Sequence, residues 1–204
     1  EPEVAVPHTV SVSDLLRARR NTGEYVDDIR RPMPRRPAPR ARIGTRFHEW
    51  VEQYYVSLGL ATVPLVDLDD VPDRGDPETA DERDLAELAR CFATGRYAEK
   101  HPLALEQPFS IVVEGQRVHG RIDAIFTEDT PQGRRYQVVD WKTGAKENTD
   151  PGQLALYQMA CAELHDVPLE HVDAVFHHVR TDRTERPELP STTELMTFLR
   201  RSRR

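Results

Sequence analysis

The sequence predicts an α/β domain in which a mixed central sheet is flanked by helices. Three strand-like runs lie in the middle of the chain, at 104–113, 116–127 and 136–141, separated by turn-forming segments. Strands joined in this way form an antiparallel meander. A helical pattern then precedes one further strand at 171–179, and a strand reached through a helix is usually parallel to its sheet neighbour. The sheet is therefore expected to combine an antiparallel meander with a parallel strand after a crossover helix.

Helices are expected on both sides of the meander. Those before it are 11–20, 44–58 and 82–94, and those after it are 151–164 and 192–200. Ser11 or Ser13 can cap the first helix, and Gly95 can end the third. Asp150 or Thr149 can cap the helix that starts at Pro151, a residue well suited to the first helical position. An apolar stripe at helical spacing marks the second helix and consists of Phe47, Val51, Tyr54 and Tyr55.

Two segments between these elements are rich in helix-breaking or charged residues. Residues 30–42 carry prolines at 32, 34, 37 and 39, which predicts an extended connector. Residues 63–80 are rich in Asp, Pro and Gly and are expected to form a loop. We therefore divide the chain into an N-terminal helix with an Arg/Pro-rich connector, residues 1–43, and a main domain, residues 44–204.

The net charge of −7 is unevenly distributed. Residues 67–87 are dominated by acids, whereas residues 30–46 contain seven arginines and no acid. Such segregation predicts a basic face able to meet a polyanion despite the overall negative charge. A disordered Arg/Pro arm without a ligand is the alternative.

The composition excludes several classes of protein. No apolar run is long enough to cross a membrane, and no charged-then-apolar leader resembles a secretion signal. Cys91 and Cys161 lack the spacing of a zinc site or an iron–sulfur cluster, which favours a reducing, cytoplasmic location. The chain begins at Glu1, so we expect it to be a piece of a longer protein. It has no Walker A sequence, so any motor must lie elsewhere.

The run Asp140-Trp141-Lys142 carries the strongest chemical signal. Side chains two residues apart in a strand share a face, so Asp140 and Lys142 are held together, and Asp123 ends the neighbouring strand. Two close carboxylates favour a cation between them, and an incomplete shell of oxygen ligands suits Mg²⁺ or Mn²⁺. The Trp141 carbonyl is an expected further ligand, and Lys142 can stabilise charge developing on a phosphate. Taken alone, Asp140 and Lys142 would be a surface salt bridge.

The order and spacing of four short motifs resemble the RecB-like branch of the PD-(D/E)xK nuclease superfamily. The motifs are Gly44-Thr-Arg-Phe-His48, Gly120-Arg-Ile-Asp123, Asp140-Trp-Lys142-Thr-Gly144 and Gln153-Leu-Ala-Leu-Tyr157. The sequence around the first motif, with Arg-Arg-Pro-Met-Pro upstream and Phe-His-His-Val-Arg-Thr downstream, is similar to the C-terminal nuclease domain of actinobacterial UvrD/RecB-type helicase–nucleases (AdnB-like). The resemblance implies a restriction-endonuclease-like core and makes residues 44–204 a RecB-like nuclease domain. The sequence lacks the cysteines that bind an iron–sulfur cluster in one subgroup of these nucleases, so we expect no cluster.

The resemblance also implies roles for individual residues. His48, Asp123 and Asp140 would bind metal, and Lys142 would be the catalytic lysine. Gln153 and Tyr157, one helical turn apart, would position the substrate or the lysine. An ordinary helix histidine and a core tyrosine are the alternatives for His48 and Tyr157. Glu106 matches a strand glutamate frequent in this branch, and three roles stay open for it: support of the ligands, a ligand of a second metal, or a strand-surface charge.

The expected function is a metal-dependent DNA nuclease that serves a helicase–nuclease in double-strand-break resection and recombination repair. A helicase motor, in the same chain or a partner subunit, would deliver single-stranded DNA. Arg42, Arg46, Arg121 and the arginines of 30–40 are candidates for contacts with DNA phosphates. The alternatives are a catalytically silent module that binds DNA ends or docks a protein, and a stand-alone DNA or RNA endonuclease.

Overall fold

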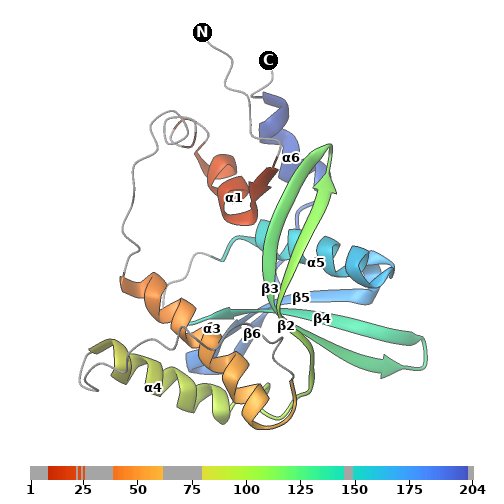
Figure 1. The fold of residues 1–204 in the computed structure, drawn as a ribbon. Helices are drawn as coiled ribbons and strands as arrows, with labels where there is room; N and C mark the ends of the chain where they lie inside the picture. Colours follow the sequence, from red (N-terminus) through yellow and green to blue (C-terminus); the bar gives the residue numbers. More distant parts are fainter. Residues whose placement is uncertain are drawn as a thin grey trace.

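The computed structural model of the protein describes residues 9–21, 23, 25, 39–61, 80–144 and 149–201, with the side chains of 39–41 and 197–201 left out. The helices are α1 (Val12–Arg20), α3 (Pro39–Ser57), α4 (Ala80–Ala93), α5 (Pro151–His165) and α6 (Thr192–Arg201). The strands are β1 (Thr9–Ser11), β2 (Pro102–Val113), β3 (Gln116–Thr130), β4 (Gly133–Lys142), β5 (Val172–His178) and β6 (Arg183–Glu185). Two short 3-10 turns, η1 (Leu169–His171) and η2 (Val179–Thr181), flank β5. Figure 1 shows the arrangement of these elements.

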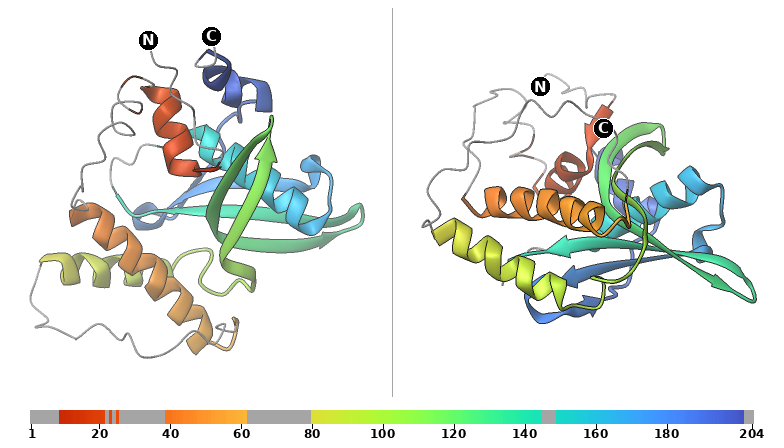
Figure 2. Two further views of the ribbon diagram at one scale, coloured as in Figure 1. Left: turned by 45° about the horizontal axis from the view of Figure 1, so that its top comes forward. Right: turned by 60° about the horizontal axis from the view of Figure 1, so that its bottom comes forward.

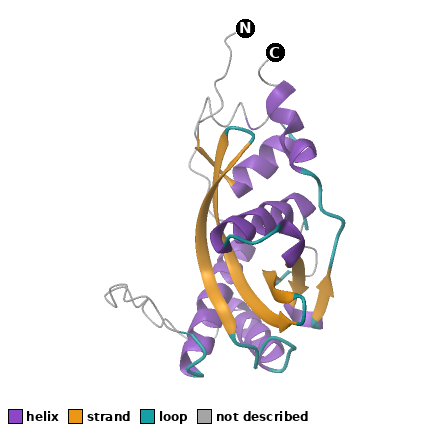
Figure 3. Ribbon diagram, turned by 90° about the vertical axis from the view of Figure 1, so that its right-hand side faces the viewer, coloured by secondary structure: helices purple, strands orange, loops and turns teal. Residues whose placement is uncertain are grey.

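The predicted mixed sheet is confirmed. β2, β3 and β4 form an antiparallel meander, and β5 lies parallel to β4 after the crossover helix α5. The six strands follow the order β1-β3-β4-β5-β6, with β2 on the other edge of β3. The sheet is strongly curved (Figure 3).

Helices cover both faces of the sheet, and each face has its own hydrophobic core. The α5-side core joins α1, α5 and α6 to the sheet and includes Leu15, Leu16, Ile122, Leu154, Leu156, Phe176, Leu195 and Met196. The α3-side core joins α3 and α4 to the opposite face and includes Phe47, Val51, Tyr55, Leu88, Phe92, Ala124, Phe126 and Trp141. Figure 2 shows α3 and α4 side by side, away from α5. The apolar stripe predicted for α3 is confirmed by the burial of Phe47, Val51 and Tyr55.

The predicted caps of two helices are also confirmed. The Ser11 hydroxyl accepts a hydrogen bond from the Asp14 N–H at the start of α1. The Asp150 carboxylate accepts one from the Gly152 N–H at the start of α5, where Pro151 occupies the first turn. Both side chains satisfy donors that the helix leaves without a backbone partner.

Two features differ from the prediction, and two predicted segments stay untested. The connector was predicted to be extended up to residue 42, but α3 already begins at Pro39, because proline is tolerated at the first helical position, where its missing N–H is not needed. The three-residue strands β1 and β6 were not predicted, since they are too short to show an alternating pattern. The rest of the Arg/Pro segment, 30–38, and the acidic loop, 63–79, lie outside the described residues.

None of the helices in the described part of the chain combines the length and the hydropathy that a membrane span requires.

Candidate active site

The sheet divides at Asp123, and the division creates the site. β2 pairs with β3 along one edge between Gln116 and Phe126, so β1 and β4 share the other edge. β1 pairs with residues up to His119, and β4 pairs from Ala124 onward. Asp123 therefore lies between the part of β3 that pairs with β1 and the part that pairs with β4. The Trp141 N–H of β4 donates to Asp123 Oδ2 at 2.8 Å, so a side chain holds the two strands together at this point.

The alternation of side chains also breaks at this point. Residues two apart in a strand normally face the same side, yet Ile122 belongs to the α5-side core and Ala124 to the α3-side core. On β2, Glu106 has a φ of 47°, a left-handed conformation that residues other than glycine rarely adopt. Strained backbone of this kind is concentrated at functional sites. The two breaks bring the carboxylates of Glu106 and Asp123 out beside α3.

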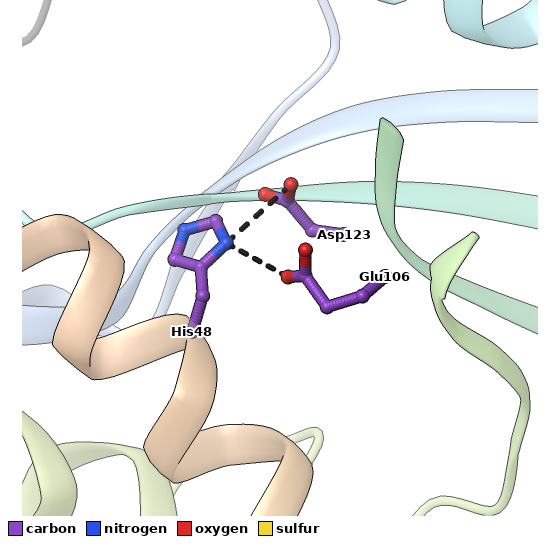
Figure 4. Close-up of side chains that lie close together, drawn as sticks. All are labelled: His48, Glu106 and Asp123. Carbon is purple, nitrogen blue, oxygen red and sulfur yellow. Dashed lines mark hydrogen bonds and ion pairs between the residues drawn. The ribbon is translucent and has the colours of Figure 1, made fainter. Parts of the chain in front are cut away.

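Three ligand-type side chains converge there. His48 Nδ1 lies 3.0 Å from Glu106 Oε1 and 3.5 Å from Asp123 Oδ1 (Figure 4). Their donor atoms all lie within 4.8 Å of one another, which makes the three side chains a possible metal-binding group. His48 comes from α3, Glu106 from β2 and Asp123 from β3, so the group joins a helix to two strands.

The electrostatics of the group are those of a cation site. Burial raises the pKa of Asp123 to about 8, and repulsion from Asp140 and Glu106 acts in the same direction, against the attraction of His48. Burial opposes protonation of His48, but Asp123, Glu106 and Asp140 outweigh it and raise its pKa to about 9. Without a metal, both Asp123 and His48 therefore hold their protons to a higher pH than usual. A divalent cation would have to displace them, because metals bind carboxylates and neutral imidazole.

Asp140 and Lys142 form the second half of the site, on the α5 side of the sheet. Lys142 Nζ lies 2.7 Å from Asp140 Oδ2, so the predicted pairing on one face is confirmed. Lys142 Nζ also donates to Gln153 Oε1 at 3.3 Å, and Gln153 Nε2 donates to the Tyr157 hydroxyl at 3.0 Å. Burial, then the charges of Asp140 and Asp123, raise the pKa of Tyr157, so its hydroxyl stays protonated. This series of hydrogen bonds, from Tyr157 through Gln153 to Lys142, fixes the position of the lysine.

Trp141 separates the two halves. Its indole is buried in the α3-side core against Phe92 and Tyr97, opposite in direction to the side chains of Asp140 and Lys142. The N–H and carbonyl of one strand residue point toward the same neighbouring strand. Because the Trp141 N–H donates to Asp123, its carbonyl also faces the edge where Asp123 lies.

The described arginines that are candidates for contacts with DNA lie at the edge of the site or on the exposed surface of α3. Arg121 Nη1 lies 3.7 Å from Glu106 Oε2, and its side chain is largely exposed at the edge of the site. Arg42 and Arg46 are exposed on α3. Arginines 30, 31, 35 and 36 lie outside the described residues, as does the side chain of Arg40.

Two of the motif glycines have different physical roles. A Cβ at Gly120 would lie 2.9 Å from atoms of Phe109 and Val12, so the α5-side core leaves no room for a side chain there. A Cβ at Gly44 would meet only the Thr143 hydroxyl, at 3.8 Å, an ordinary contact.

A model of the PD-(D/E)XK nuclease superfamily matches residues 18–200. The chain belongs to the PD-(D/E)XK nuclease superfamily. Among curated proteins, none matches the chain. A solved structure described as the crystal structure of SSO0001 is similar at 16% sequence identity, over 98% of this chain and 77% of that one, with a TM-score of 0.37.

The residues present fit the divalent metal on which PD-(D/E)XK nucleases generally depend. Two carboxylates and one imidazole, with a third carboxylate buried nearby, are suitable ligands for a hard or borderline divalent ion. Burial first, and then repulsion from Asp140, raise the pKa of Asp123, as is expected of a buried ligand beside other acids without a counter-ion.

Sequence reasoning assigned no role to two residues that support this PD-(D/E)XK site. Phe176 of β5 lies under Lys142, with the ring centroid 4.9 Å from Nζ. Arg180 of η2 donates to the Thr143 carbonyl at 2.9 Å and pairs with Asp84 of α4 at 2.5 Å. Their signals were the place of Phe176 within the predicted parallel strand and of Arg180 directly after it, in the run Phe176-His-His-Val-Arg-Thr181 that belongs to the flanking resemblance.

Proposed function

We propose that this PD-(D/E)XK protein is a divalent-metal-dependent deoxyribonuclease, the nuclease module of a helicase–nuclease that resects double-strand breaks for recombination repair. The convergence of a His–Glu–Asp ligand group with a held lysine supports hydrolysis of a phosphodiester. Intact carboxylates and lysine also argue against a catalytically silent module.

His48, Glu106 and Asp123 would hold the ion, with Asp140 and the Trp141 carbonyl as further ligands. When bound, Mg²⁺ or Mn²⁺ supplies a Lewis acid for the phosphate oxygens. Asp140 and Gln153 hold Lys142 so that its ammonium group faces the position where charge grows on the phosphate. A fixed positive charge in a buried site stabilises that charge without reorganising. Tyr157 fixes the orientation of the Gln153 amide.

Single-stranded DNA is the substrate that we infer, delivered by a motor in the same chain or a partner subunit in the cytoplasm. Arg121 and Arg46 would contact phosphates at the edge of the site, where exposed arginines add affinity that depends on salt. An active site that reads only the backbone needs no recognition sequence.

The test is cleavage of single-stranded and duplex DNA by the wild type with EDTA, Mg²⁺ or Mn²⁺. We expect cleavage with a metal and loss of it in Lys142→Ala and Asp123→Ala. Lys100→Ala is the matched control, since Lys100 lies against Tyr97, away from the ligand group. If the wild type cuts no better than Lys142→Ala with every metal, the enzyme proposal fails. If the wild type does cut, addition of the helicase motor should speed digestion of duplex DNA in an ATP-dependent manner. A cleavage rate that does not change when the motor is added would favour a stand-alone endonuclease.

A further inference from the structure

Lys142 has an aromatic partner outside the four motifs. Its ammonium nitrogen lies 4.9 Å from the centroid of the Phe176 ring, within the range of a cation–π interaction. The register of the parallel strands explains the contact. Phe176 of β5 is opposite Asp140 of β4, so its side chain stands on the same face of the sheet as Asp140 and Lys142.

The contact is well shielded from water. Phe176 is fully buried in the α5-side core, and the Lys142 side chain is only 12% exposed. Cation–π attraction is strongest where the cation is removed from solvent. A ring in this position attracts an ammonium group and offers no proton acceptor, so it contributes differently from the two polar partners.

The three partners of Lys142 are not equivalent. Asp140 lies 2.7 Å from Nζ, but it is also a proposed ligand, and a carboxylate shared with a cation attracts the ammonium less. Gln153 provides a longer contact, at 3.3 Å. The phenyl ring of Phe176 binds no metal and carries no charge, so its attraction is the same with and without an ion.

We propose that Phe176 is a positioning residue that holds the Lys142 ammonium at the reacting phosphate through its ring face, an inference that rests on the proposed nuclease function. Phe176 touches neither substrate nor ion and acts only through the lysine. The ring sets the depth of the ammonium group below the site, while Asp140 and Gln153 set its direction.

A fluorination series tests the electrostatic part of this role. Mono-, tri- and pentafluorophenylalanine at position 176 keep the shape of the ring and progressively remove the negative charge from its face. We expect kcat to fall stepwise, by roughly 3- to 30-fold at full fluorination, with KM unchanged. The same series at Phe126, which is buried in the α3-side core, is the control and should leave kcat unchanged. An equal kcat across the series at position 176 would overturn the proposal.

A second measurement needs no cleavage. Protons above a ring face resonate upfield, so the ε-methylene of Lys142 should be shifted upfield in NMR spectra of lysine-labelled protein, with Lys142→Met providing the assignment. The shift should disappear in Phe176→Leu while the shifts of Lys100 stay unchanged. If it persists in Phe176→Leu, the contact is absent and the inference fails, whatever the enzyme does. If the shift behaves as expected but the wild type does not cut DNA, the proposed function fails and the contact between Phe176 and Lys142 stands.

Discussion

Raising the pH of the metal-free protein from 7 to 9.5 should destabilise it by way of His48 and Asp123. The folded-state pKa of His48 is about 9, above the ordinary 6.5, so its stabilising charge is fully present below pH 6.5 and is lost as the pH passes through 9. The folded-state pKa of Asp123 is about 8 instead of 3.8, so the folded protein holds a proton that the unfolded chain has already released. Both groups therefore make stability fall with rising pH.

The size of the effect follows from the shifts. One pKa unit corresponds to about 1.4 kcal/mol, and His48 and Asp123 lie 3.5 Å apart and titrate as a pair, so between pH 7 and 9.5 the pair together contributes a loss on the order of 3 kcal/mol. His177, whose pKa burial lowers to about 4, changes stability only below about pH 6.5 and does not interfere. The expected total of about 3 kcal/mol is a large part of the stability of an ordinary domain.

Urea unfolding in EDTA, followed by the fluorescence of Trp50 and Trp141, measures the loss at each pH. Asp123→Asn is the matched control. It removes the titrating carboxyl of residue 123 and with it a main electrostatic attraction that raises the pKa of His48. Its stability should change much less over the same range. With saturating Mg²⁺, the part of the wild-type decrease that comes from His48 and Asp123 should vanish, because the ion binds the deprotonated ligands. Parallel curves for the wild type and Asp123→Asn in EDTA would refute the electrostatic account of the site.

Three further outcomes are expected. Gly120→Ala should lower the free energy of unfolding by about 1–3 kcal/mol, because the added methyl group overpacks the α5-side core. Gly44→Ala should raise it by up to about 1 kcal/mol, because there is room for the methyl group and alanine favours a helix. Equal effects of the two substitutions in urea unfolding would contradict this difference in packing. Arg180→Met should cost about 1–3 kcal/mol in the same assay, because it removes a donor to the Thr143 carbonyl and the ion pairs of Arg180 with Asp84 and Glu87 of α4. Lys142→Ala should lower kcat by roughly 100- to 1000-fold while calorimetry still detects Mn²⁺ binding, and loss of both would show that the lysine helps to build the metal site.

The order and type of the main elements could be predicted because their signals are local. Turn residues and strand-length runs mark the meander, and Ser11 and Asp150 mark helix starts through hydrogen bonds to nearby N–H groups. The pairing of Asp140 with Lys142 could be predicted for the same reason, since strand geometry alone places them on one face.

The remaining features depend on contacts between distant segments. The left-handed conformation of Glu106 and the break in alternation at Asp123 have no local sequence signal, so the place of Glu106 beside His48 could not be derived. The contact of Phe176 with Lys142 depends on the register of two strands separated by a helix. Register is decided by the packing of both sheet faces and cannot be read from either strand alone.

The division of the sheet at Asp123 also has a consequence for the order of folding. Glu106 and Asp123 lie on one hairpin, so local pairing brings two acids together early, whereas His48 joins them only after a much longer segment of chain has closed. During that interval the hairpin carries repulsion without its counter-charge. Divalent ions or mild acid present during refolding should therefore speed the pairing of β2 with β3, which gives the site a part in assembling the protein as well as in its chemistry.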